Sequence, residues 1–320
     1  MTSNTDNLWA PAPFAVAAAG LPPAVRLYEV GPRDGLQAES KLVPTDIKVE
    51  FCRRLVAAGV STVELTSFVS PKWIPQLADA EQLMADVALP DHIRQVVLAP
   101  NQRGLDRALA VGAREIAVFV SATETFASKN LNTTIDGALD AAEPVVRGAL
   151  AAGLPVRGYI SMVFGDPWEG QVSSSQVAAV AERLVQMGVS TLSLGDTIGV
   201  ATPGHVHDVL ATVLATGIDV SALAMHFHDT YGQALTNVYA SLQAGITEFD
   251  SSAGGLGRCP YAKGATGNLA TEDLLWMLHG LGITTGIDLD ALTDTSIWMA
   301  KQIGHPTASR VVTALAAARS

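Results

Sequence analysis

The chain has 320 residues, of which 48% are hydrophobic and 16% are charged, a composition typical of a compact globular protein with a large core. Its formal net charge of −11 argues against nucleic acid as a partner, because phosphate binding needs clustered Lys and Arg. No apolar run is long enough to cross a bilayer, so the sequence predicts neither a membrane span nor a membrane partner.

Residues 1–24 are expected to form an N-terminal tail. The tail contains no Lys or Arg, so it matches neither the basic start of a secretory signal nor an Arg-rich transit peptide. The two cysteines, Cys52 and Cys259, are too few for a disulfide framework in a chain of this length. We therefore expect a reducing, cytoplasmic location.

From residue 25 onward, short β-branched runs alternate with longer Ala- and Leu-rich runs. The expected strands are residues 25–30, 60–66, 93–98, 115–121, 156–163, 190–195, 222–228 and 246–251. The expected helices include residues 45–58, 101–111, 135–152, 174–187, 203–215, 232–244 and 271–281. Glycines such as Gly59 and Gly188 follow several of these helices, where a C-cap is expected.

This alternation predicts parallel βαβ units, and eight expected strands predict a closed (β/α)8 TIM barrel. A doubly wound open sheet is the alternative, but no glycine-rich phosphate turn near the first strand supports it. Beyond about residue 282 the sequence indicates extra C-terminal helices. We expect residues 25–320 to form a single catalytic domain that includes this helical extension.

A metal site is indicated by His226 and His228, which lie two apart in a strand and therefore point to the same face. Asp34 follows the first strand, whose end lies on the same rim of a barrel. Such nitrogen and oxygen donors suit Mg²⁺, Mn²⁺, Co²⁺ or Zn²⁺. A structural histidine pair is the alternative, and the nearby Asp34 and Asp229 argue against it. Amidohydrolase-type barrels carry further histidines on the fifth and sixth strands, which this chain lacks.

The other polar residues of interest also follow expected strands, where barrel active sites lie. They are Arg33 after the first strand, Glu64 at the end of the second, Asp196 at the end of the sixth, and Cys259 and Asn268 after the eighth. Arg33 is either catalytic or a salt-bridge partner of Glu64 or Asp196. Burial would raise the pKa of these carboxyls unless Arg33 or a cation compensates. Cys259 is either a reactive thiol or inert.

Five motifs carry a resemblance to a known family. They are Val-Gly-Pro-Arg-Asp-Gly-Leu-Gln (30–37), Glu-Leu-Thr-Ser-Phe-Val-Ser-Pro-Lys-Trp (64–73), Leu-Gly-Asp-Thr-Ile-Gly-Val (194–200), His-Phe-His-Asp-Thr-Tyr-Gly-Gln-Ala (226–234) and Gly-Gly-Leu-Gly-Arg-Cys-Pro-Tyr-Ala-Lys-Gly-Ala (254–265). Together they resemble the hydroxymethylglutaryl-CoA lyase family, over roughly residues 25–290. That family belongs to a wider group of metal-dependent barrel lyases and condensing enzymes.

The resemblance implies retro-Claisen cleavage of a 3-hydroxy-3-methylacyl-CoA, giving acetyl-CoA and acetoacetate as in leucine degradation. It implies a divalent cation, Mg²⁺ or Mn²⁺, and a homo-oligomer, dimer or tetramer. The implied metal ligands are Asp34, His226, His228 and Asn268. The implied catalytic residues are Arg33, Cys259, Glu64 and Asp196, and the implied contacts to CoA are Lys129 and Asn130.

The chain departs from the family pattern at several positions, which are Ser40, Asp166, Arg258, Lys263 and Thr266. These differences leave a related substrate such as citramalyl-CoA open. A Claisen condensing synthase is a further alternative, but such enzymes usually carry a C-terminal regulatory domain, and only about forty residues follow the expected barrel. A non-catalytic metal-binding scaffold predicts degenerate motifs, whereas the motifs here are intact.

Overall fold

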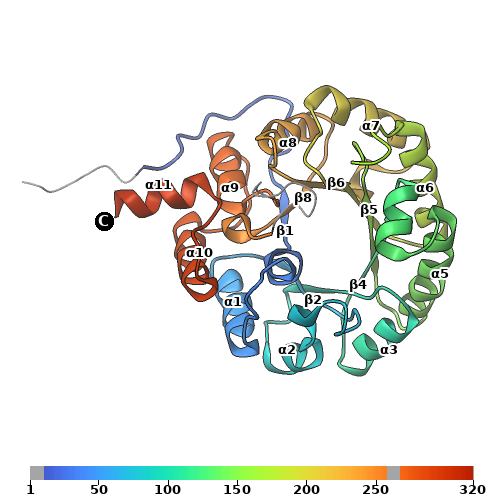
Figure 1. Cartoon of the computed structure of the whole chain (residues 1–320). Coiled ribbons are helices and arrows are strands. Elements are labelled where there is room, and N and C mark those ends of the chain that lie inside the picture. The colour runs from blue at the N-terminus through green and yellow to red at the C-terminus, as the bar shows by residue number, and fades with distance from the viewer. Residues whose placement is uncertain (1–10, 258–266, 320) are drawn as a thin grey trace, which may run out of the picture.

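The computed structural model describes residues 11–257 and 267–319. Eight parallel strands form a closed barrel in sequence order, with a ring of helices outside it (Figure 1). The expected (β/α)8 barrel is therefore confirmed. The chain closes the ring by pairing its last strand with its first, in a register that joins Arg26 to Glu248 and Glu29 to Ser251.

The strands lie within two residues of the expected bounds. They are β1 Arg26–Glu29, β2 Thr62–Ser67, β3 Arg94–Leu98, β4 Ile116–Ser121, β5 Val156–Ser161, β6 Thr191–Asp196, β7 Leu223–Phe227 and β8 Glu248–Ser251. Nearly all their residues are buried, because helices cover the outside of the sheet and side chains fill its interior. This explains why the strands read as continuous apolar runs rather than alternating ones.

The helices of the barrel also match the expected pattern. They are α1 Thr45–Ala57, α2 Ala80–Asp86, α3 Gln102–Ala110, α4 Glu124–Phe126, α5 Ile135–Ala151, α6 Ser174–Met187, α7 Pro203–Ala215, α8 Ala234–Gln243 and α9 Thr271–Gly280. The short α2 and α4 were not among the expected helices. Gly59, after α1, has a φ of +97°, and an added Cβ would lie 2.3 Å from the carbonyl oxygen of Gly286, so no larger residue fits there.

The core has two parts. The larger one lies between the strands and the surrounding helices, and a smaller one inside the barrel includes Tyr28, Val96 and Tyr159. Inside the barrel there are also buried charges, among them Arg157, which has no exposed surface. Among the described residues, no helix is long and apolar enough to span a membrane.

The C-terminal extension consists of α10 Leu289–Ile303 and α11 Arg310–Ala318, which pack beside α1 and α9. Glu272 on α9 is buried at this junction. It accepts hydrogen bonds from the backbone N–H of Gly254, at 2.8 Å, and from the hydroxyl of Ser296 on α10. Burial raises the pKa of Glu272 to about 8 despite these two hydrogen bonds. The extension is thus joined to the barrel through a carboxyl that favours its protonated form.

The substitution Glu272→Gln should make stability less sensitive to alkali. The folded chain holds the Glu272 proton up to about pH 8, so the stability that this carboxyl contributes is present at acidic pH and is lost as pH rises through about 8. Glutamine keeps the shape but cannot ionise. Between about pH 5 and about pH 8.5, the free energy of unfolding should shift by at least about 1 kcal/mol in favour of the variant.

Urea denaturation at the two pH values measures this difference. Glu182→Gln, on the exposed face of α6, serves as the control and should show no such shift. Parallel pH profiles for the Glu272 variant and the native chain would contradict the assignment.

Candidate active site

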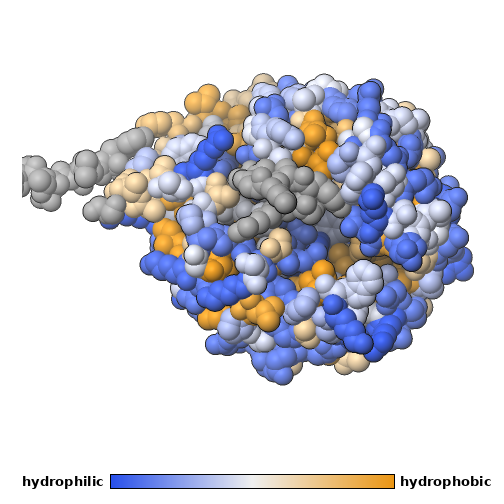
Figure 2. All heavy atoms as spheres, in the orientation of Figure 1, coloured by the Kyte–Doolittle hydropathy of each residue, from blue (hydrophilic) through white to orange (hydrophobic). Residues whose placement is uncertain are grey.

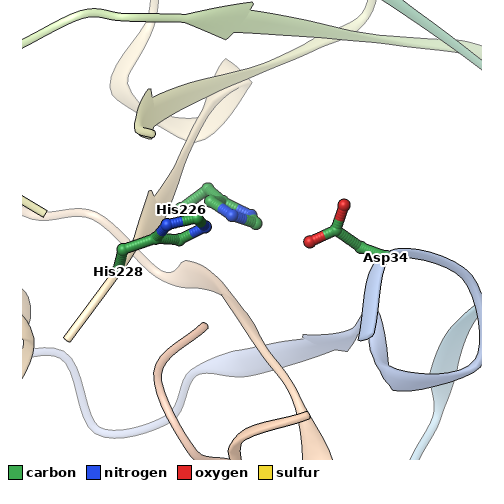
Figure 3. A group of neighbouring side chains, drawn as sticks. All are labelled: Asp34, His226 and His228. Carbon is green, nitrogen blue, oxygen red and sulfur yellow. The ribbon is translucent and has the colours of Figure 1, made fainter. Parts of the chain in front are cut away.

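Asp34, His226 and His228 meet at one rim of the barrel. Each offers one ligand atom, and these atoms all lie within 4.8 Å of one another. His226 lies in β7 and His228 directly after it, and their rings lie on the same side with centroids 5.2 Å apart. The carboxylate of Asp34 faces them from the turn after β1 (Figure 3). The structure thus brings together the two imidazoles and the carboxylate that the sequence analysis grouped.

Asn268 joins this group through backbone pairing. The segment that contains it lies along the end of β7, where the N–H of Leu269 donates to Phe227 O at 3.1 Å and Asn268 pairs with His228. The Asn268 side-chain amide donates to Asp34 Oδ2 at 2.8 Å. Within the described residues, Asn268 Oδ1 and His228 Nδ1 are buried and have no hydrogen-bond partner. Two unpaired acceptors beside a carboxylate fit a cation.

Two of the three members have protonation states that suit a cation, whereas in His226 the lowering of the pKa by burial is outweighed by Asp250 and Asp34, which raise it. Burial opposes ionisation of Asp34, but Arg33, His226 and the Asn268 hydrogen bond outweigh it and lower the pKa of Asp34 to about 2. Burial, reinforced by His226, lowers the pKa of His228 to about 3. At neutral pH Asp34 is therefore an anion and His228 is neutral, the forms in which both side chains bind metals.

Arg33 and Asp34 follow the first strand, as the sequence analysis expected, but in a helical turn that it did not expect. β1 ends at Glu29, and both residues lie in a helical turn, Gly31–Gly35. In this turn the backbone N–H groups of Arg33, Asp34 and Gly35 all point toward Val30 O, at 3.2, 2.8 and 3.1 Å. An added Cβ at Gly35 would lie 2.8 Å from Leu256 Cβ, so a larger residue would push this turn away from the last loop of the barrel.

Arg33 makes two ion pairs, to Asp34 Oδ1 and to Glu64 Oε2, each at 2.8 Å. Glu64 was one of the two partners that the sequence left open. It lies inside β2 rather than at its end, which corrects that expectation. Burial raises the pKa of Glu64 although the paired Arg33 lowers it. Among the described residues, Arg33 Nε and Glu64 Oε1 remain without hydrogen-bond partners.

Asp196 lies at the end of β6, as expected. Its carboxylate accepts hydrogen bonds from the N–H groups of Val200 and Ala201, at 2.9 and 3.1 Å, so it also holds the loop that leads to α7. Burial raises the pKa of Asp196 to about 7 despite these bonds. A carboxyl with this pKa can both accept and return a proton near neutral pH.

Lys129 and Asn130 lie in the exposed turn Ala127–Leu131, on the loop after β4. The Lys129 ammonium stands 5.0 Å from the centre of the Trp168 ring, on the loop after β5. Asp166 holds that second loop by accepting bonds from Thr123 Oγ1 and from the N–H groups of Trp168 and Glu169. Cys259 and Arg258 lie outside the described residues.

Two inward-facing residues that the sequence analysis did not select contact the site. The Tyr159 hydroxyl donates to Glu64 Oε2 at 3.0 Å, and the Arg33 guanidinium lies 5.6 Å from the centre of its ring. Asp250 on β8 accepts from His226 Nδ1 at 3.1 Å. The only signal for Tyr159 and Asp250 in the sequence was that each is a polar residue within an expected apolar strand. Figure 2 shows the same face of the molecule hollowed near its centre, with many hydrophilic residues around the hollow.

Comparisons with known proteins agree with this geometry. The HMGL-like family model matches residues 24–298. The chain is 51% identical over 296 residues to the mitochondrial hydroxymethylglutaryl-CoA lyase of Arabidopsis thaliana. The aligned region covers 92% of this chain and 63% of that protein. The chain belongs to the hydroxymethylglutaryl-CoA lyase family.

Solved structures of the family superpose closely. The hydroxymethylglutaryl-CoA lyase of Pseudomonas aeruginosa is 48% identical with a TM-score of 0.91, over 93% of this chain and 99% of that one. The enzyme of Acinetobacter baumannii, solved with coenzyme A and 3-methylmalate, is 37% identical with a TM-score of 0.87, over 93% of this chain and 97% of that one.

Proposed function

We propose that this chain is a divalent-metal-dependent carbon–carbon lyase that cleaves 3-hydroxy-3-methylglutaryl-CoA to acetyl-CoA and acetoacetate. The observation that carries the proposal is the grouping of Asp34, His226 and His228 within 4.8 Å, with Arg33 and its ion pairs alongside. Family membership supplies the reaction class.

The proposed ligands are Asp34, His226, His228 and Asn268, and the proposed cation is Mg²⁺ or Mn²⁺. The unpaired Asn268 Oδ1 and His228 Nδ1 support this assignment. When bound, the cation would act as a Lewis acid toward the hydroxyl and carboxyl oxygens of the substrate. The protein residues must then move the proton and stabilise the charge that forms on the thioester.

Asp196 would accept the proton of the tertiary hydroxyl, because its pKa of about 7 suits a base at neutral pH. The C–O bond then becomes a carbonyl as the carbon–carbon bond breaks, and the electron pair passes to the thioester as an enolate. Arg33 would stabilise this enolate through its unpaired Nε–H, while Glu64 holds the guanidinium in place. Cys259 would deliver the proton that completes acetyl-CoA.

Lys129 and Asn130 would contact CoA from the exposed loop after β4, where a cation can meet phosphate. The structure of the Acinetobacter baumannii relative with coenzyme A supports an acyl-CoA substrate. We further propose a homo-oligomer, dimer or tetramer, that acts in leucine degradation in the cytoplasm. Relatives carry both cytoplasmic and mitochondrial names.

A panel of acyl-CoA thioesters tests the activity. Acetyl-CoA release is measured with Mg²⁺ or Mn²⁺ for hydroxymethylglutaryl-CoA and citramalyl-CoA, and condensation is measured from acetyl-CoA and a 3-oxo acid. The highest kcat/KM should belong to cleavage of hydroxymethylglutaryl-CoA. Preference for citramalyl-CoA, or turnover only in the condensing direction, would overturn the proposed substrate or reaction.

His228→Ala should weaken Mn²⁺ binding and reduce turnover together, because it removes one ligand from the proposed set of four. Mn²⁺ affinity can be followed by electron paramagnetic resonance of the free ion, and activity by acetyl-CoA release. His207→Ala, at an exposed position on α7, is the matched control and should change neither. Full activity of chelator-treated native protein would contradict the metal assignment.

Arg33→Gln should lower kcat by about two orders of magnitude or more, the scale of losing a preorganised oxyanion donor, with little change in Mn²⁺ affinity. Arg33→Lys keeps the charge but not the forked geometry that reaches Asp34 and Glu64. Its kcat should therefore lie between that of the native protein and that of Arg33→Gln. Steady-state kinetics measure both variants. A raised KM with an unchanged kcat would make Arg33 a binding residue instead.

A further inference from the structure

The barrel interior beneath the proposed metal site contains an ion network where barrels usually have layers of branched apolar side chains. Arg157 on β5 is completely buried and extends across the barrel to β8. There its Nη1 pairs with Glu248, on the side away from the site, and its Nη2 pairs with Asp250 at 2.5 Å. The guanidinium therefore makes two ion pairs, and only the pair with Asp250 lies on the side of the proposed metal site.

Asp250 uses both carboxylate oxygens. Oδ1 pairs with Arg157, and Oδ2 accepts from Ser193 Oγ at 2.8 Å and lies 3.1 Å from His226 Nδ1. The strand register explains the last contact, because His226 and Asp250 are direct partners across β7 and β8. The three partners of Asp250 come from three different strands, so the position of its carboxylate is fixed by the barrel itself.

Asp250 Oδ2 accepts from the ring, so in the neutral form of His226 the proton lies on Nδ1. Nε2 is then left as the acceptor nitrogen. Arg157 is itself held firmly, because its guanidinium lies 3.9 Å from the centre of the Tyr28 ring and 5.3 Å from that of Tyr159. The order Arg157, Asp250, His226 therefore runs from the middle of the barrel to the rim.

We propose that Asp250, held by Arg157 and Ser193, is a positioning residue that fixes the ring and the tautomer of His226 for metal binding. This inference rests on the proposed function, because it takes His226 as a ligand. Stability alone is a weak explanation for the arrangement, since replacing a buried ion network with well-packed apolar side chains often causes no loss of stability. What apolar side chains cannot supply is a fixed acceptor for His226 Nδ1.

Mn²⁺ titration of the metal-free protein tests the proposal without using activity. Asp250→Ala should raise the Kd for Mn²⁺ by about 10- to 100-fold, the usual effect of removing such a partner. Asp250→Asn keeps the size of the side chain but replaces one of its two acceptor oxygens with an NH2 donor, which must face either Arg157 Nη2 or His226 Nδ1, so it should weaken Mn²⁺ binding as well. Ser193→Ala removes a single hydrogen bond to the same oxygen, and should raise the Kd by about two- to fivefold. It provides the measurement if Asp250→Ala does not fold.

Glu248→Gln is the matched control, because it disturbs the other ion pair of Arg157, the one with Glu248, and leaves Asp250 in place. Its Kd for Mn²⁺ should stay within about twofold of the native value even if its melting temperature falls. Equal weakening by Glu248→Gln and Asp250→Ala would show that the network acts only through barrel stability. Native affinity in Asp250→Ala would also overturn the inference. If the native protein itself does not bind Mn²⁺, the proposed metal site fails instead.

Discussion

The site depends on the closure of the barrel between β1 and β8. This pairing joins the first and last strands in a fixed register, and it places the turn after β1 beside the segment that follows β8. As a result, the Asn268 amide reaches Asp34 Oδ2 at 2.8 Å although 234 positions separate the two residues. An open sheet of the same elements would leave them at opposite edges. The closed topology therefore creates the cluster, and the local sequence only supplies its members.

Burial then divides the carboxyl groups of the site into two kinds. Asp34 has Arg33, two imidazoles and an amide around it, and these keep it ionised although it is half-buried. Asp196 accepts from two backbone N–H groups and has no salt bridge among the described residues, and burial raises its pKa to about 7. The difference arises from the number of positive neighbours rather than from residue type. A single rim thus offers both a permanent anion and a group that can exchange protons near neutral pH.

The sequence was sufficient to predict the strands, the barrel and the grouping of Asp34, His226 and His228 at its rim. Glycine positions and apolar runs are local signals, and each strand carries its own. The contacts that support the site were harder to predict, because they join distant inward-facing residues. Tyr159 and Glu64 are 95 positions apart, and no local pattern indicates which polar side chains meet inside a barrel. The helical turn with Arg33 and Asp34 was also missed, since a single turn has no periodicity.

The C-terminal extension has a direct structural link to the start of the glycine-rich segment. Gly254 O accepts hydrogen bonds from Thr307 Oγ1 and from the N–H groups of Ala308 and Ser309, at 2.7, 3.0 and 3.3 Å. On the other side of the same residue, its N–H donates to Glu272. Because Gly254 has a φ of +66° and an added Cβ would lie 3.0 Å from Thr307 Oγ1, a larger residue would strain this junction. The loop before α11 therefore contributes to the geometry of the barrel rim as directly as the strands do.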